Sequence, residues 1–255
     1  MWYNGAMFTT MPDPIAFTVF GVDVRWYGIL VATGIMLATF WTYKRFPRHG
    51  LDQDAVFDIA MISIPCAIIG ARLYYVIFQW DSYSGDLLRI LNIRSGGLAV
   101  HGGLIAGFLA AYFVCRHKNI RFLDGLDACV PGIALAQAIG RWGNYFNSEA
   151  HGGPTDLPWA IVINGQSVHP TFLYESIWCL LLFIILFYID DHRKFIGQTA
   201  LLYGMLYSLE RFFVEALRTD SLMIGPFRQA QVLSATVIVI CLAAYLIMRK
   251  KNSLK

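Results

Sequence analysis

Seven stretches of about 20 mostly apolar residues run along this 255-residue chain, and they constrain its fold more than any other feature. A helix needs about 20 such residues to cross the roughly 30 Å hydrocarbon core of a bilayer. Charge is correspondingly scarce: 15% of the residues are charged and 57% are hydrophobic, against roughly 25% and 45–50% in a soluble domain. The sequence therefore predicts an all-α integral membrane protein, with transmembrane helices near 22–43, 55–78, 97–115, 122–146, 170–189, 198–217 and 229–248.

The basic residues indicate the orientation of these helices, because cytoplasmic loops of membrane proteins are enriched in Lys and Arg. Twelve of the twenty bases fall on one side of the predicted bilayer: Lys44, Arg45, Arg48, Arg116, Lys118, Arg121, Arg193, Lys194, Arg249, Lys250, Lys251 and Lys255. Four fall on the other side: Arg89, Arg94, Arg218 and Arg228. This alternation through seven spans predicts a single polytopic domain, residues 1–255, with its N-terminus outside and its C-terminus in the cytoplasm.

One sizeable loop, residues 147–169, lies on the outer side of this topology and contains neither Lys nor Arg. Its composition predicts a small extracytoplasmic head. A strand pair is expected around 159–162 and Val168, turning at Asn164 and Gly165, because Asn-Gly favours the tight turn of a hairpin.

Composition excludes several function classes. A net charge of +3 with so few charged residues does not support nucleic-acid binding. The five cysteines are scattered through apolar runs without a CxxC or Cys-His cluster, so no disulfide framework and no metal site is expected. We predict no cofactor. Asp124 and Asp127 are the nearest approach to clustered aspartates, and acids at a helix N-terminus stabilise the helix without further explanation.

Four bases, Arg25, Arg72, Arg141 and Arg211, fall inside predicted spans or at their outer ends. A charge at the centre of a spanning helix costs roughly 2.5–3.5 kcal/mol on insertion scales, and such residues usually face the bundle interior. These arginines are therefore the first functional candidates.

The densest polar segment runs from Gly140 to Gly152 and surrounds Arg141. Helical spacing places Arg141 near one face with Asn144, while Gly140 and Gly143 leave room for a close neighbour. Arg141 lies about 7 Å below the end of its span, at about the depth of a lipid phosphate. The alternative is an arginine that only extends its head group to the interface.

A second polar set lies in the predicted span 198–217. Tyr207, Arg211, Glu215 and Arg218 follow steps of four, four and three, so all four can line one stripe facing the bundle. The alternative is a purely structural role, in which Arg211 forms an ion pair with Glu215 or Glu210 that stabilises the packing. The two interpretations are compatible, because a carboxylate can orient a guanidinium that still has free donors.

His101 stands in a glycine-rich stretch of the predicted span 97–115. Glycines weaken a helix unless something must approach its backbone, and neutral imidazole is well suited to accept a proton near pH 7. His101 is therefore the candidate base, and Tyr27 offers a phenol. For Thr171 and Glu175, at the start of the span 170–189, a structural role is at least as plausible as a catalytic one.

The Gly140-to-Gly152 segment resembles the signature of the bacterial prolipoprotein diacylglyceryl transferases, G-R-x-G-N-F-x-N-x-E-x-x-G, with Tyr145 where phenylalanine is usual. Supporting segments follow in family order: Arg25-Trp26-Tyr27-Gly28, His101-Gly102-Gly103-Leu104, His169-Pro170 with Tyr174-Glu175, and Tyr207 with Arg211, Phe212, Glu215 and Arg218. The resemblance covers nearly the whole chain.

The resemblance implies transfer of the diacylglyceryl group of phosphatidylglycerol to the lipobox cysteine thiol of a prolipoprotein, with release of glycerol phosphate. It implies a multi-pass protein of the bacterial cytoplasmic (inner) membrane, whose site faces the outer leaflet and whose partners are phosphatidylglycerol, the prolipoprotein signal peptide and membrane lipids. By matching position, Arg141 and Arg211 would hold the lipid headgroup. The other essential positions would be His101, Tyr27, Asn144, Glu149, Gly152, Tyr207 and Glu215.

The charge of this reaction moves from the thiolate sulfur onto the departing phosphate, which goes from about −1 toward −2. Two fixed arginines stabilise that change without a metal. Glu149 and Glu215 are expected to orient other groups, and glycines such as Gly102 and Gly103 are expected to let the lipid approach. The alternatives from other classes are a small transporter or lipid flippase and a noncatalytic assembly subunit.

Overall fold

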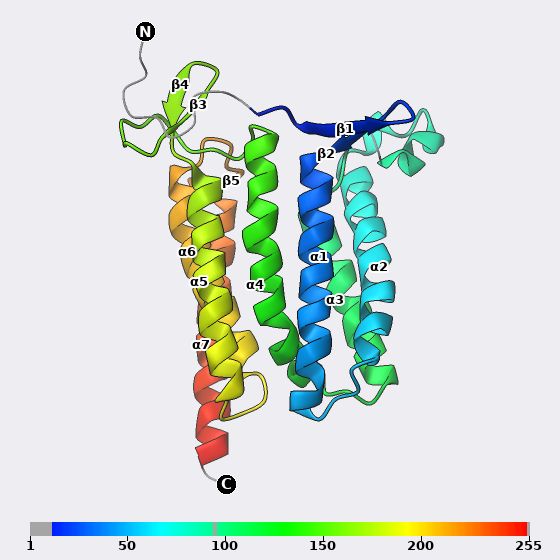
Figure 1. Cartoon of the computed structure of the whole chain (residues 1–255), viewed down its shortest axis with the longest axis vertical. Helices are drawn as coiled ribbons and strands as arrows, with labels where there is room; N and C mark the ends of the chain where they lie inside the picture. The colour runs from blue at the N-terminus through cyan, green and yellow to red at the C-terminus, as the bar shows by residue number, and fades with distance from the viewer. Residues whose placement is uncertain (1–11, 94–95, 254–255) are drawn as a thin grey trace. The chain divides into compact units, whose positions relative to one another are not determined.

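The computed structural model describes residues 12–93 and 96–253 of the chain (Figure 1). The predicted helical segments are all confirmed as helices: α1 (Trp26–Arg45), α2 (Ala55–Phe78), α3 (Val100–His117), α4 (Phe122–Phe146), α5 (Thr171–Asp191), α6 (Gln198–Leu217) and α7 (Gln229–Ser253). Arg94 and Lys255, which entered the charge comparison, lie outside the described residues.

Three short antiparallel hairpins join or precede these helices in the described part of the chain: β1 (Ile15–Val19) with β2 (Val22–Arg25), β3 (Ile161–Ile163) with β4 (Gln166–Val168), and β5 (Met223–Ile224) with β6 (Phe227–Arg228). Only β3–β4 is predicted from the sequence. The helix predicted to begin at 22 begins at Trp26, because 22–25 pair with β1 instead.

Five of the described helices are long and apolar enough to cross a bilayer: α1, α2, α4, α5 and α7. The chain is a multi-pass membrane protein. The other two, α3 and α6, are 18 and 20 residues long and are not among these five. That they also span, and that the N-terminus lies outside, stay predictions from the charge pattern.

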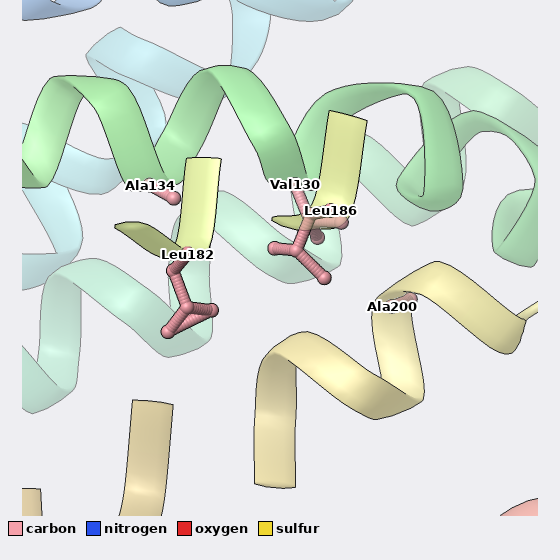
Figure 2. Close-up of a cluster of buried hydrophobic side chains, with 5 residues drawn as sticks. All are labelled: Val130, Ala134, Leu182, Leu186 and Ala200. Atoms are coloured by element: carbon pink, nitrogen blue, oxygen red, sulfur yellow. The ribbon is translucent and has the colours of Figure 1, made fainter. Parts of the chain in front are cut away.

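The described residues divide into two compact units, a larger one from residues up to Trp41 and from Leu126 onward, and a smaller one from Thr42 to Gly125. In the larger unit α4, α5 and α6 pack around an apolar cluster (Figure 2): Val130, Ala134, Leu182, Leu186 and Ala200. Trp178 of α5 also donates its indole N–H to the backbone oxygen of Leu206 on α6, at 3.1 Å. Apolar packing and this hydrogen bond fix α5 against α6.

Glycines bring α1 close to α4 within the larger unit. A Cβ at Gly34 would lie 3.0 Å from the backbone oxygen of Ala136, and one at Gly132 would lie 3.0 Å from that of Ala38. Small residues at such crossings let helix backbones approach each other closely. The start of α1 is thereby held beside the C-terminal end of α4, where Trp26 stacks on Phe146 with ring centroids 5.2 Å apart.

The predicted head contains the expected hairpin. Ile163 pairs with Gln166 across Asn164 and Gly165, whose φ values of 50° and 78° are those that a type I′ turn requires. Ile161, Ile163 and Val168 are buried with Phe172 at the start of α5. The strand begins at Ile161, slightly later than predicted, and the head packs directly on the end of the helix that follows it.

The smaller unit is built on a very close contact between α2 and α3. A Cβ at Gly70 would come within 2.7 Å of the backbone oxygen of Gly102, and one at Gly102 within 2.4 Å of that of Gly70. A Cβ at Gly103 would approach the Ala67 backbone oxygen to 3.2 Å. The neighbour that requires these glycines of α3 is therefore α2, whereas the sequence suggests a lipid.

Arg72, a candidate from the sequence, organises a loop of the same unit. Its guanidinium makes five hydrogen bonds to the backbone oxygens of Arg89, Ile90, Asn92, Gly96 and Gly97, at 2.6–3.0 Å. An arginine has five N–H donors, so this set satisfies all of them. Arg72 is 4% exposed and binds these five backbone oxygens, so it has no donor left for a substrate anion.

The two aspartates near the start of α4 do not stabilise their own helix alone. Asp124 contacts His49 in the smaller unit at 3.0 Å. In the larger unit the fully buried Asp127 accepts from the backbone N–H groups of Gly197 and Ala200, at 2.6 and 2.8 Å, and from Arg193 at 3.0 Å. Asp127 thus satisfies the free N–H groups at the start of α6.

Candidate functional site

The two arginines singled out by the sequence meet in the larger unit. Arg141 lies near the C-terminal end of α4 and Arg211 in the C-terminal half of α6. Both contact the same atom, Oε1 of Glu175 near the start of α5, with Nη2 of Arg141 at 3.1 Å and Nη1 of Arg211 at 3.0 Å. The two guanidinium groups are therefore close enough to act on one anion.

Each arginine has a second partner on α6. Nη2 of Arg141 donates to the hydroxyl oxygen of Tyr207 at 3.0 Å, and Nη2 of Arg211 contacts Oε2 of Glu215 at 2.5 Å. The side chains of Arg141 and Arg211 are each 20% exposed, whereas those of Glu175 and Glu215 are 0% and 3% exposed. The buried carboxylates hold the guanidinium groups in place, and the part of the arginine cluster that remains exposed consists of the two arginine side chains.

We call Arg141, Glu175, Tyr207, Arg211 and Glu215 the arginine cluster. Its two cations and two carboxylates balance in charge. Oε2 of Glu175 has no hydrogen-bond partner among the described residues, so only one oxygen of this carboxylate is shared by the two arginines. Charged pairs at such low exposure require good geometry to offset the cost of leaving water, and an arginine held by fixed partners is pre-organised to bind an incoming anion.

The predicted stripe on α6 is confirmed, and Arg218 continues it. Arg218 lies 4.0 Å from Glu215 and makes two hydrogen bonds to Asp220, at 2.9 and 2.7 Å. These hydrogen bonds hold the pKa of Asp220 below its usual value. Arg228 donates to the backbone oxygens of Glu215 and Arg218, so two more arginines close the end of α6 next to the cluster.

The predicted face of α4 also turns toward α6. Tyr203 donates its hydroxyl to Oε1 of Gln137 at 2.8 Å, one turn below the Arg141–Tyr207 hydrogen bond. The neighbour of Gly143 is Tyr27 of α1, since a Cβ at Gly143 would lie 2.6 Å from Cδ2 of that ring. No atom of the described residues 12–93 and 96–253 lies within 4 Å of the equivalent position at Gly140. The prediction of a close neighbour is therefore correct for Gly143, whereas the described structure shows none for Gly140.

Gly152 links the head to the end of α6. Its N–H donates to the backbone oxygen of His169 at 2.9 Å, and it forms a β-bridge with Arg218. A Cβ there would lie 2.7 Å from Cβ of His169 and 3.1 Å from the backbone oxygen of Leu217. Packing alone therefore excludes a side chain at this position.

Other candidates lie apart from these contacts. Glu149 is exposed and accepts from Asn147 at 3.1 Å, while Asn144 is half-buried on α4. His101 is exposed in the first turn of α3, in the smaller unit, with its ring 6.3 Å from that of Tyr74. Gly102 and Gly103 pack on α2 as described. The arginine cluster itself is formed by four of the predicted residues and Glu175.

Glu175 is the member whose importance the sequence understates. Its position at the start of a span suggests a helix-end role, and it is 0% exposed. The available signal is that Glu175 is the only charged residue in residues 170–189, because an isolated charge in an apolar helix needs a partner. Among the described residues no group of three or more His, Cys, Asp or Glu side chains could hold a metal ion.

Comparison with known proteins agrees with the signature in the sequence. The profile of the prolipoprotein diacylglyceryl transferase family matches residues 14–247. A phosphatidylglycerol–prolipoprotein diacylglyceryl transferase of Clostridioides difficile is 51% identical over 94% of this chain and 97% of its own length. Proteins of the same name from Finegoldia magna and Staphylococcus aureus are 50% and 46% identical, covering 89% and 94% of this chain and 92% and 90% of theirs.

Proposed function

The chain belongs to the prolipoprotein diacylglyceryl transferase family, and we propose that it performs this transfer at the arginine cluster. The reaction passes the diacylglyceryl group of phosphatidylglycerol to a prolipoprotein. A carbon–sulfur bond forms between the lipobox cysteine and C3 of the lipid glycerol, while the bond from C3 to the phosphate oxygen breaks and glycerol phosphate leaves. The observation that carries this assignment is that Arg141 and Arg211 share one carboxylate oxygen, at 3.1 and 3.0 Å.

In this mechanism the two arginines bind the lipid phosphate and stabilise its departure. The phosphate changes from about −1 to about −2, so two cations bind the leaving group more strongly than the bound lipid, and that difference lowers the barrier. Glu215 and Glu175 hold the guanidinium groups in place, and Tyr207 fixes Arg141. None of these roles requires the carboxylates to touch the phosphate, which they would repel.

The thiol must lose its proton before it attacks, because the thiolate is the nucleophile. We assign His101 as the acceptor, since neutral imidazole accepts a proton near pH 7. Tyr27, Asn144 and Glu149 complete the polar groups that surround the reacting atoms in the proposal. Replacement of His101 by Gln is expected to abolish most turnover between pH 6 and 8; substantial turnover in that variant would assign the proton to another group.

Both substrates are amphipathic, so the proposed site opens sideways into the outer leaflet of the bacterial cytoplasmic membrane. Support comes from the charge alternation, which places the N-terminus and residues 147–169 outside. The head is proposed to receive the signal peptide, with Gly152 in its base.

Arg141→Lys and Arg211→Lys test the proposal. Lysine keeps the charge but cannot form two parallel hydrogen bonds with fixed geometry. Each variant is expected to lose about 100-fold or more in kcat/KM, as removal of one transition-state donor does elsewhere, measured as lipid transfer to a lipobox peptide.

Arg193→Lys is the matched control. Arg193 also pairs with a buried carboxylate, Asp127, at 3.0 Å, but it lies in the loop between α5 and α6, at the opposite end of α6 from Arg211. This variant should retain transfer within a few-fold of wild type. Near wild-type transfer by both cluster variants would overturn the assignment.

A further inference from the structure

Glu210 is a buried carboxyl next to the arginine cluster that no step of the reaction uses. It precedes Arg211 on α6 and is 7% exposed. Neither of its carboxyl oxygens has a hydrogen-bond partner among the described residues. Glu175 and Glu215, by contrast, each pair with an arginine at 3.1 Å or less. The sequence offers Glu210 as a partner for Arg211, but the structure gives that place to Glu175 and Glu215.

The groups that face Glu210 come from three helices of the larger unit. Arg141 from α4, Glu175 from α5 and the neighbouring Arg211 lie within its electrostatic reach, and so does the thiol of Cys179 on α5. The fourth helix, α7, packs on α6 but has no charged residue from Gln229 to Met248. Within the part of the chain that the structure describes, the cations that act on Glu210 are therefore the two arginines of the cluster.

The charges of this set change when an anion binds. The arginine cluster is neutral without Glu210, because its two carboxylates match its two cations. An ionised Glu210 makes the set negative, and a phosphate with a charge of about −1 makes it more negative still, in surroundings where charges are weakly screened. Protonation of Glu210 removes its own charge, so that only the phosphate charge is added to the neutral cluster.

We propose that Glu210 is a positioning residue that takes up a proton when a phosphodiester binds at Arg141 and Arg211, so that the site accepts the anion without a third carboxylate charge. The inference rests on the proposed function, because it takes the lipid phosphate as the anion. Glu210 acts through the arginines and does not touch the reacting atoms. Since the bound form holds one more proton, the affinity for phosphatidylglycerol falls as pH rises.

The direct test is proton uptake on lipid binding. Short-chain phosphatidylglycerol is titrated into the purified full-length protein by calorimetry, in buffers of different ionisation enthalpy, from about pH 6 to pH 9. For the wild-type protein, the number of protons taken up per lipid bound is expected to rise toward one as the pH is raised. Its Kd for phosphatidylglycerol should increase by up to about tenfold per pH unit in that range. Glu210→Gln should take up none, with a Kd that does not follow pH.

Two further variants make the result decisive. Methionine in Glu210→Met is uncharged like glutamine but needs no hydrogen-bond partner in the protein interior. This variant therefore tests whether proton uptake depends on Glu210 if Glu210→Gln does not fold. Asp190→Asn is the matched control: Asp190 is 4% exposed, lies at the other end of α5 and accepts from Thr199 at 3.3 Å. This control should show wild-type uptake.

Uptake that persists unchanged in the Glu210 variants would overturn the proposal, and so would wild-type binding without uptake across the pH range. Either result leaves the transferase assignment intact as long as the wild-type protein transfers lipid to a peptide. If wild-type protein neither binds phosphatidylglycerol nor transfers lipid, the proposed function itself fails.

Discussion

Gly152 shows how a single residue can be required by backbone packing next to a site. Its position is enclosed by His169, Thr171 and the backbone of Leu217. The hydroxyl of Thr171, at the start of α5, donates to the backbone oxygen of Ala150, two residues before Gly152. The loop after α4 is thereby held on the end of α6, where Glu215 and Arg218 lie. A residue that the signature marks as essential thus has a structural reason to be glycine.

Gly152→Ala is expected to destabilise the protein by about 1–3 kcal/mol, as overpacking of a tight site does, because the backbone of Leu217 or His169 must move. Gly153→Ala is the matched control, since a Cβ there meets nothing closer than 3.9 Å. The melting temperature in detergent and the protease sensitivity of the head should change for Gly152→Ala alone. Equal stability of the two variants would contradict this view of Gly152.

For the secondary-structure elements, the hydrophobic pattern predicts the helices that pack through apolar surfaces. It does not predict the segments that are held in place by polar contacts. The seven helices follow from their apolar runs, and the β3–β4 hairpin follows from Asn164-Gly165. The β1–β2 hairpin turns at Phe20-Gly21 and so lacks the Asn-Gly signal, and the β5–β6 strands are only two residues long. The hydrogen bonds of Arg72 to five backbone oxygens have no sequence pattern either. The same limit explains Glu175, whose two arginine partners come from different helices.

The contact between α1 and α4 makes a prediction at this scale. Gly143→Ala should displace the ring of Tyr27, because the new Cβ would lie 2.6 Å from it, and small displacements of positioned groups reduce rates strongly. We expect at least a roughly tenfold loss of transfer in a peptide assay, with helix content unchanged by circular dichroism.

Gly140→Ala is its control, because no described residue comes within 4 Å of the added carbon. It should transfer at close to the wild-type rate. A full-rate Gly143→Ala enzyme would remove Tyr27 from the proposed site.

For the whole molecule, the positions of the few charged residues are more informative than their small number. Most basic residues lie in loops on one predicted side, and Arg25 lies in the exposed strand β2 rather than in a helix. The other three arginines of the predicted spans have specific partners: Arg72 binds backbone oxygens, and Arg141 and Arg211 share Glu175. These arginines therefore either stabilise the structure with all their donors, as Arg72 does, or remain partly exposed, as the two in the arginine cluster do.

The predicted orientation can be measured by cysteine labelling. Asp156→Cys in the head and Lys251→Cys near the C-terminus are both exposed positions. In intact cells a membrane-impermeant maleimide should label only the Asp156→Cys protein, and permeabilised cells should label both. The unsubstituted chain is the control, since its five cysteines are buried or half-buried. Labelling of Lys251→Cys in intact cells would invert the topology.

The central claim is that this chain transfers a diacylglyceryl group to a peptide thiol. Purified protein, phosphatidylglycerol and a synthetic lipobox peptide are incubated together, and the mass of the peptide is read before and after. We expect a gain of one diacylglyceryl group on the cysteine, with glycerol phosphate released in equal amount, and an initial rate lower by about 100-fold or more with an Arg211→Lys protein. A folded protein that binds the lipid yet leaves the peptide mass unchanged would contradict this claim.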